Sequence, residues 1–218
     1  MSSALTPIGV DSVVSAPITI VTRLQYILAG TLASPYAISG HQFSGPGKAI
    51  SALYFQLSLI SKGTSGGLII VGSYVPKTTK QVDELKLQCG HNLRTIEVCV
   101  DKLAMKSEEE REEEISGAAE LAEVYLRTGK DTLVMSSRKL ITRNTPAESL
   151  DINFKVSSGL VEIVRRIKTS PRYILAKGGI TSSDIATKAL EAKHAKIVGQ
   201  ALAGVPLWQL GPGNYLST

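Results

Sequence analysis

The stretch YILAKGGITSSDIATKAL, residues 173–190, contains the most informative local pattern of the chain. It begins with apolar residues typical of a buried strand and continues through a double glycine and three hydroxyl residues. It ends in a pattern typical of a helix. A strand–glycine–helix turn leaves backbone N–H groups free at a helix N-terminus, where the helix dipole favours an anion. The stretch therefore predicts an α/β unit whose turn suits a phosphate.

The residues of this turn have the chemistry that a phosphate site needs. Gly178 and Gly179 lack a Cβ, so a ligand can approach the backbone closely. Thr181, Ser182 and Ser183 can cap the helix or donate hydrogen bonds to phosphate oxygens. The turn is therefore our first candidate for a binding site.

Two charged residues flank the turn. We expect Lys177 to be a mobile cation beside the loop, and Asp184 to lie in the first turn of a helix over residues 184–192. Turns of this kind also occur purely as tight connections, and neither the Walker pattern nor G-x-G-x-x-G is present. The turn alone leaves both interpretations open.

The composition excludes several classes of protein. The chain has 218 residues, of which 43% are apolar and 5% aromatic, and its formal net charge is +5. The basic residues are spread out and no stacking platform is visible, which argues against nucleic-acid binding. Cys89 and Cys99 form neither a disulfide framework nor a zinc pattern, which favours reduced thiols in a cytoplasmic protein. No spacing of ligand residues indicates a metal site.

From Gly66 onward, apolar runs alternate with helical patterns. Such alternation predicts a three-layer α/β/α fold with a largely parallel sheet. Ligands of such sheets bind beyond the carboxyl ends of the strands, and three of these ends carry small polar residues. The predicted strands are 68–73, 94–100, 132–137, 173–179, 196–202 and 205–210. The predicted helices are 76–88, 107–128, 150–167 and 184–192.

Residues 1–65 differ in character from residues 66–218, the predicted domain. They are rich in Ser, Pro, Gly and Ala and contain a single acidic residue, Asp11. Their apolar stretches, 26–33 and 50–60, are shorter than the roughly 18–20 residues of a membrane span. The scarcity of acids is a feature of organellar transit peptides, but arginine is scarce as well. We expect a poorly ordered segment with one or two short helices.

Three motifs together resemble the four-carbon acid sugar kinase family. They are GSYVPKTTKQ (72–81), KGGITSSDIATKAL (177–190) and GQALAGVPLWQLG (199–211). The resemblance is to the C-terminal nucleotide-binding domain, most closely that of plant proteins in which the kinase is fused to a class II ketose-bisphosphate aldolase. It spans about residues 66–211.

The resemblance implies a phosphoryl transfer. Members of the family use ATP, with Mg²⁺, to phosphorylate three- and four-carbon sugar acids such as threonate and erythronate. Their N-terminal domain holds the sugar acid and their C-terminal domain holds ATP. Association with an aldolase is implied by the plant fusion.

The resemblance also implies which residues bind the cofactor. Thr78 and Gln81 match family positions that we assign to helix initiation and packing. The end of the strand 68–73 is expected to line the nucleotide site, and the turn at residues 178–182 is expected to hold the phosphates. The implied cofactor-binding residues are Gly72, Ser73, Lys177, Gly178, Gly179, Ile180, Thr181 and Ser182.

The chain departs from the family pattern at both ends. Residues 1–65 do not resemble the substrate domain, and GPGNYLST does not match the glycine-rich segment that follows the Val-Pro strand in the family. We identify no catalytic base, since Asp184 fits a structural role better. The sequence therefore predicts the ATP-binding half of a sugar-acid kinase. One alternative is a non-catalytic remnant without an active nucleotide site, which docks onto a partner or has no ligand. The other is a different doubly wound nucleotide enzyme, although no NAD fingerprint is present.

Overall fold

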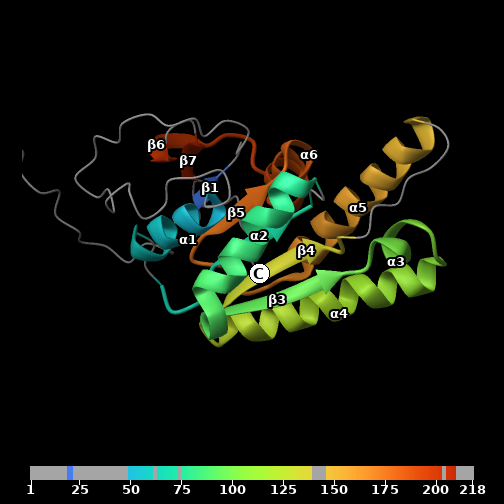
Figure 1. The fold of residues 1–218 in the computed structure, drawn as a ribbon, viewed down its shortest axis with the longest axis horizontal. Coiled ribbons are helices and arrows are strands. Elements are labelled where there is room, and N and C mark those ends of the chain that lie inside the picture. The colour runs from blue at the N-terminus through green and yellow to red at the C-terminus, as the bar shows by residue number, and fades with distance from the viewer. Residues whose placement is uncertain are drawn as a thin grey trace, which may run out of the picture.

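A seven-stranded sheet is the centre of the structure, a computed structural model that describes residues 19–21, 49–60, 63–72, 75–138, 146–202 and 205–209 (Figure 1). The strand order is β3-β4-β2-β5-β1-β7-β6. The strands are β1 Thr19–Val21, β2 Leu68–Val71, β3 Leu93–Val98, β4 Asp131–Ser136, β5 Ile174–Lys177, β6 Lys196–Leu202 and β7 Val205–Gln209. The first five strands of this order run parallel, and β7 pairs antiparallel with β1 and β6. The predicted α/β fold with a largely parallel sheet is confirmed.

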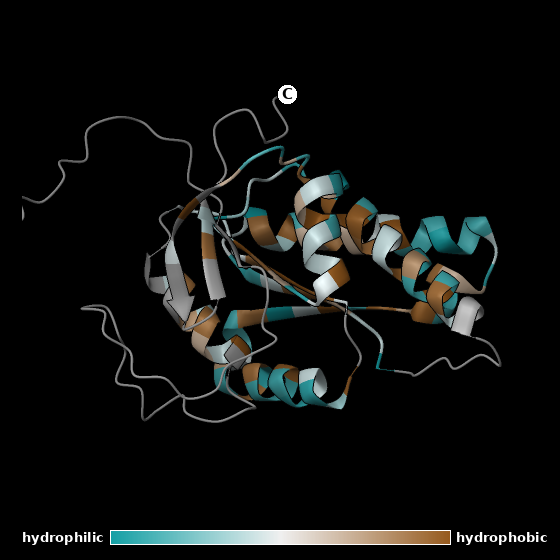
Figure 2. Ribbon diagram, turned by 90° about the horizontal axis from the view of Figure 1, so that it is seen from above, coloured by the Kyte–Doolittle hydropathy of each residue, from teal (hydrophilic) through white to brown (hydrophobic). Residues whose placement is uncertain are grey.

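Helices cover both faces of the sheet. On one face, α1 and α2 pack on alternate strand residues such as Ile69 and Val71. On the other face, α3, α4, α5 and η2 pack on Leu68 and Ile70. Figure 2 shows the sheet between these two layers. The helices are α1 Ala49–Ile60, α2 Pro76–Cys89, η1 Gly90–Asn92, α3 Val100–Ala104, α4 Glu108–Arg127, α5 Pro146–Arg166, α6 Gly179–Asp184 and η2 Ile185–Ala189.

The burial of β2 explains why its sequence is apolar throughout. All four residues, 68–71, are fully buried, since a central parallel strand is covered on both faces. The starts of two helices follow directly from sequence signals. Ser107 caps α4 in a capping box with Glu110, and α2 begins with Pro76. The predicted helices 76–88, 107–128 and 150–167 agree with α2, α4 and α5 within a few residues.

Part of the first 65 residues belongs to the same core. Ile50, Leu53 and Leu57 of α1 are fully buried against α2 and the sheet. β1, a strand of three residues, lies between β5 and β7, and no sequence pattern predicted it. The described part of the segment thus contributes one helix and one strand. A separation into units 1–65 and 66–218 stays a prediction.

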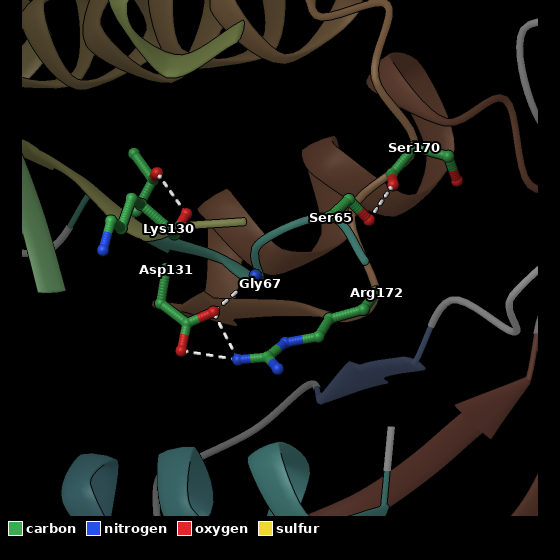
Figure 3. Close-up of polar contacts among 7 residues, drawn as sticks. Ser65, Gly67, Lys130, Asp131, Ser170 and Arg172 are labelled. Atoms are coloured by element: carbon green, nitrogen blue, oxygen red, sulfur yellow. Dashed lines mark hydrogen bonds and ion pairs between the residues drawn. The ribbon is translucent and has the colours of Figure 1, made fainter. Parts of the chain in front are cut away.

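A charged clamp joins the starts of three strands at the amino edge of the sheet (Figure 3). Asp131, the first residue of β4, accepts hydrogen bonds from the Gly67 N–H at 2.6 Å and from Arg172 at 2.6 and 2.7 Å. Gly67 precedes β2 and Arg172 precedes β5. A Cβ on Gly67 would lie 2.1 Å from the Tyr173 ring, so only glycine fits there. The clamp therefore aligns β2, β4 and β5 at their starts.

We expect Asp131→Asn to lower the free energy of unfolding by about 3 kcal/mol. Asparagine keeps the acceptor for Gly67 but leaves the Arg172 guanidinium, whose side chain is 20% exposed, without its counter-charge. Chemical denaturation measures the loss.

The control for this experiment is Asp151→Asn. It breaks the exposed Asp151–Lys155 pair of α5, and we expect it to change stability by less than about 0.5 kcal/mol. In a double-mutant cycle, Arg172→Met should remove most of the effect of Asp131→Asn. An unchanged effect in that background would show that the clamp is not the cause.

Candidate functional site

The carboxyl ends of three neighbouring strands lie level with one another. Val71, at the end of β2, is in register with Met135 of β4 and with Lys177 of β5. The Ser136 hydroxyl donates a hydrogen bond to the Gly72 carbonyl at 3.2 Å, which joins two of the ends. The polar strand ends that the sequence singled out are therefore brought together at one edge of the sheet. Ser73 lies outside the described residues.

The chain leaves these strand ends toward opposite faces of the sheet. From β2 it enters α2, on the face that carries α1, whereas β4 and β5 lead to α5 and α6–η2 on the other face. Ligands of open parallel sheets bind outside the carboxyl ends at the point where the connections diverge in this way. The end of β2, flanked by β4 and β5, is that point.

The turn after β5 differs in one respect from the prediction. The helix begins at Gly179, five residues before the predicted start at Asp184, and continues as the π-turn η2. Gly178 precedes it with φ 122° and ψ 139°, a conformation that glycine alone adopts without strain. The predicted helix over residues 184–192 is therefore wrong at its start, and Asp184 is the last residue of α6 rather than a first-turn residue.

The hydroxyl residues explain the wrong boundary. Thr181 and Ser182 lie inside α6, buried, and neither caps it. The Ser182 hydroxyl donates to the Gly179 carbonyl of its own helix at 3.2 Å, and thereby satisfies the polar group that sequence reasoning assigned to a cap. Thr181 packs against the end of β2, since a Cβ on Gly72 would lie 2.2 Å from its Oγ1. Gly72 thus permits the close approach of β2 and α6.

The first turn of α6 is open to solvent. A Cβ on Gly179 would meet no atom within 4 Å, and Ile180 is 58% exposed. The first helical hydrogen bond runs from the Ser182 N–H to the Gly178 carbonyl at 2.9 Å. The N–H groups of the preceding residues have no partner within the helix, as at any helix start. The turn therefore has backbone donors without helical partners next to open space at Gly179.

Two lysines lie near the carboxyl ends of β2 and β5. Lys177 is half-buried at the end of β5, and its pKa is lowered by burial and by the charge of Lys77. Lys77 is the second residue of α2, in a helix turn that disfavours a cation. Within the described ranges, neither lysine forms an ion pair. Lys177 and Lys77 thus both bring positive charge to this edge of the sheet.

Comparison with known proteins assigns the chain to a family. The sequence profile of the family described as a nucleotide-binding C-terminal domain matches residues 68–217, more than half of the chain. The chain belongs to this family. No curated protein and no solved structure matches it.

The match begins at the first residue of β2 and includes every implied cofactor-binding residue of the nucleotide-binding domain. Gly72, Lys177, Gly178, Gly179 and Ile180 lie at the carboxyl edge described above, and Thr181 and Ser182 lie beneath it with buried side chains. Their binding roles stay predictions. Sequence reasoning did not name Lys77, although a lysine in a first helical turn was a signal that could have found it.

The remaining residues that the sequence analysis considered, Asp184, Thr78 and Gln81, make contacts within the fold. Asp184 accepts a hydrogen bond from Ser157 of α5 at 2.7 Å and pairs with Lys188 at 2.8 Å, so its carboxylate joins α6 to α5. This agrees with the structural role that we assigned to it. Thr78 and Gln81 are buried within α2, which agrees with packing.

The described residues contain two free cysteines, Cys89 and Cys99, and no set of metal ligands. Cys89 is a free thiol, and burial raises its pKa to about 11, so it is protonated at neutral pH. No group of three or more His, Cys, Asp or Glu side chains in the described ranges is arranged to hold a metal ion. No helix in these ranges is long and apolar enough to cross a bilayer.

We expect Lys177→Met to raise the melting temperature at pH 7 by about 2 °C. The folded chain holds the Lys177 proton more weakly than the unfolded chain, so the charge opposes folding below the folded-state pKa. The penalty shrinks as the pH rises toward about 10.4, the ordinary pKa of lysine. Thermal unfolding of the variant and the unmodified chain at pH 7 and pH 10 measures the difference.

The matched control is Lys80→Met, which removes an exposed charge from α2, one turn after Lys77. It should change the melting temperature little at either pH. A lower melting temperature of Lys177→Met at pH 7 would contradict the assignment of an electrostatic penalty to this residue.

Proposed function

We propose that the chain binds ATP at the carboxyl edge of its sheet, as the nucleotide-binding half of a kinase for three- or four-carbon sugar acids. The observation that carries the proposal is the open first turn of α6 at Gly179, close to the end of β2, at an edge where Lys77 and Lys177 have no carboxylate partner among the described residues. Membership in a nucleotide-binding family supports the ligand class. The three sequence motifs support the sugar-acid substrate.

The parts of this edge suit different parts of the nucleotide. Free N–H groups of the first turn of α6 can donate to phosphate oxygens, and Gly179 leaves room for them. Lys177 supplies charge beside the same turn. Mg²⁺ would neutralise phosphate charge in the transfer, and in our proposal it enters with the nucleotide, because the described residues contain no carboxylate cluster for it.

A binding role without catalysis is the second candidate. Phosphoryl transfer to a hydroxyl needs a group that orients or deprotonates the acceptor. Asp184, the carboxylate nearest to the turn in sequence, is occupied by Ser157 and Lys188 and is therefore not available for this step. In this second role the chain holds a nucleotide. A partner supplies the acceptor hydroxyl and the group that deprotonates it.

Thermal unfolding with and without millimolar Mg-ATP tests the binding site. Ligand at a hundredfold excess over Kd stabilises the folded state by about 2.7 kcal/mol. We expect an upward shift with ATP, and we expect Gly179→Val to abolish it, because the valine side chain would occupy the open space at the turn.

Gly117→Val is the matched control for Gly179→Val. Gly117 lies on the exposed side of α4, where a Cβ also meets no neighbour, and the ATP shift should persist in this variant. A shift that persists in a folded Gly179→Val variant would refute the turn as the site. No shift in the unmodified chain would refute nucleotide binding. Transfer of phosphate from ATP to threonate or erythronate then separates the kinase from the binding role.

A further inference from the structure

The outer face of α4 carries apolar side chains that the described part of the chain leaves uncovered. Leu121 and Val124 are 48% and 45% exposed, whereas Ala122 and Leu126, on the inner side of the same helix, are fully buried. Residues three positions apart lie on one side of a helix, so Leu121 and Val124 form one surface. Figure 1 shows α4 at the outer border of the structure, beside the edge strand β3. This face is therefore accessible to another molecule.

Gly117 lies one turn before Leu121 on this face, and no neighbour within the described chain requires a glycine there. A Cβ on Gly117 would meet no atom within 4 Å. Gly159 of α5 differs in this respect, because a Cβ there would lie 2.9 Å from the side chain of Leu103. Glycine in a helix interior is less stable than alanine. The glycine at position 117 leaves a notch in the outer face, which suits a side chain of a second molecule.

Charge is divided between the two ends of the same face. The helix begins with EEEREEE (108–114) and ends at Arg127. Glu113, one turn before the notch, and Arg127, one turn after Val124, are both exposed, and neither forms an ion pair with another described residue. This order of charges suits the helix dipole. It also makes the face complementary to a second copy of itself that runs in the opposite direction.

We propose that two copies of the chain associate through α4 in an antiparallel arrangement, with a two-fold axis at the middle of the helix. Glu113 and Arg127 lie seven residues on either side of position 120, so each faces the other residue of the second copy. Val124 of each copy enters the notch at Gly117 of the other, and the two Leu121 side chains meet near the axis. A parallel pair would instead place like charges together.

Glu120 sets a limit on the strength of this dimer. It is exposed at the midpoint of the helix, so the two-fold axis brings it close to its own copy. Two carboxylates that approach each other repel. An interface built around one helix is also small compared with those of stable dimers. We therefore expect a weak dimer that forms as the protein concentration rises.

Sedimentation equilibrium of the full chain, from micromolar to millimolar concentration, measures the dissociation constant. Leu121→Ser should raise it about tenfold, because apolar area is lost at the centre of the interface. Glu120→Gln should lower it, because the repulsion at the axis is removed. Leu87→Ser is the matched control: it removes an exposed leucine from α2 and should leave the dissociation constant unchanged. Thermal unfolding verifies that each variant is folded.

Charge reversal tests the antiparallel orientation. Glu113→Lys and Arg127→Glu should each weaken the dimer about threefold, and the double variant should regain the affinity of the unmodified chain, because both pairs re-form with exchanged signs. Additive weakening in the double variant would overturn the orientation. A chain that stays monomeric at every concentration, or a dimer that Leu121→Ser does not weaken, would overturn the interface. None of these outcomes bears on the proposed nucleotide site.

Discussion

The structure depends on the buried carboxylate of Asp131, which aligns three strands at their starts. Around it the Thr132 N–H donates to the Gly67 carbonyl at 2.8 Å, and the Arg172 N–H donates to Gly66 at 3.1 Å. β2 and β5 are only four residues long, about 13 Å each, so their starts set the level of their ends. The electrostatic contact at the amino edge thereby positions the candidate site at the opposite edge.

Local patterns were sufficient for most of the fold. Apolar runs predicted the buried strands, and the Ser107 cap with its acidic first turn predicted α4, because these signals act within a few residues. The start of α6 was mispredicted for an equally physical reason. Threonine and serine favour caps when their hydroxyls lack other partners, but Ser182 bonds to its own helix and Thr181 packs against Gly72. Tertiary contact thus overrode a local preference.

The features that sequence reasoning missed are those that depend on distant partners. Asp131 and Arg172 are 41 residues apart and share no motif, so nothing in either neighbourhood indicated an ion pair. Lys77 and Lys177 are 100 positions apart, and both lie near the carboxyl edge because β2 and β5 are adjacent. The glycine turn was found because all its information is local. A site assembled across strands is visible in sequence only where one of its parts forms a motif.

The two edges of the sheet use buried charge in opposite ways. At the amino edge, Asp131 neutralises Arg172 within the chain, so the pair needs no ligand, and removal of either partner alone is destabilising. At the carboxyl edge, Lys177 carries a charge that burial and Lys77 both oppose, and the described residues supply no carboxylate to it. A charge that destabilises the free protein is retained at no benefit unless something outside the chain neutralises it. In the proposed nucleotide site, an anion beside Lys177 would offset this cost. Such an opposition between stability and binding is what separates the proposed ligand site from the structural ion pair on the same sheet.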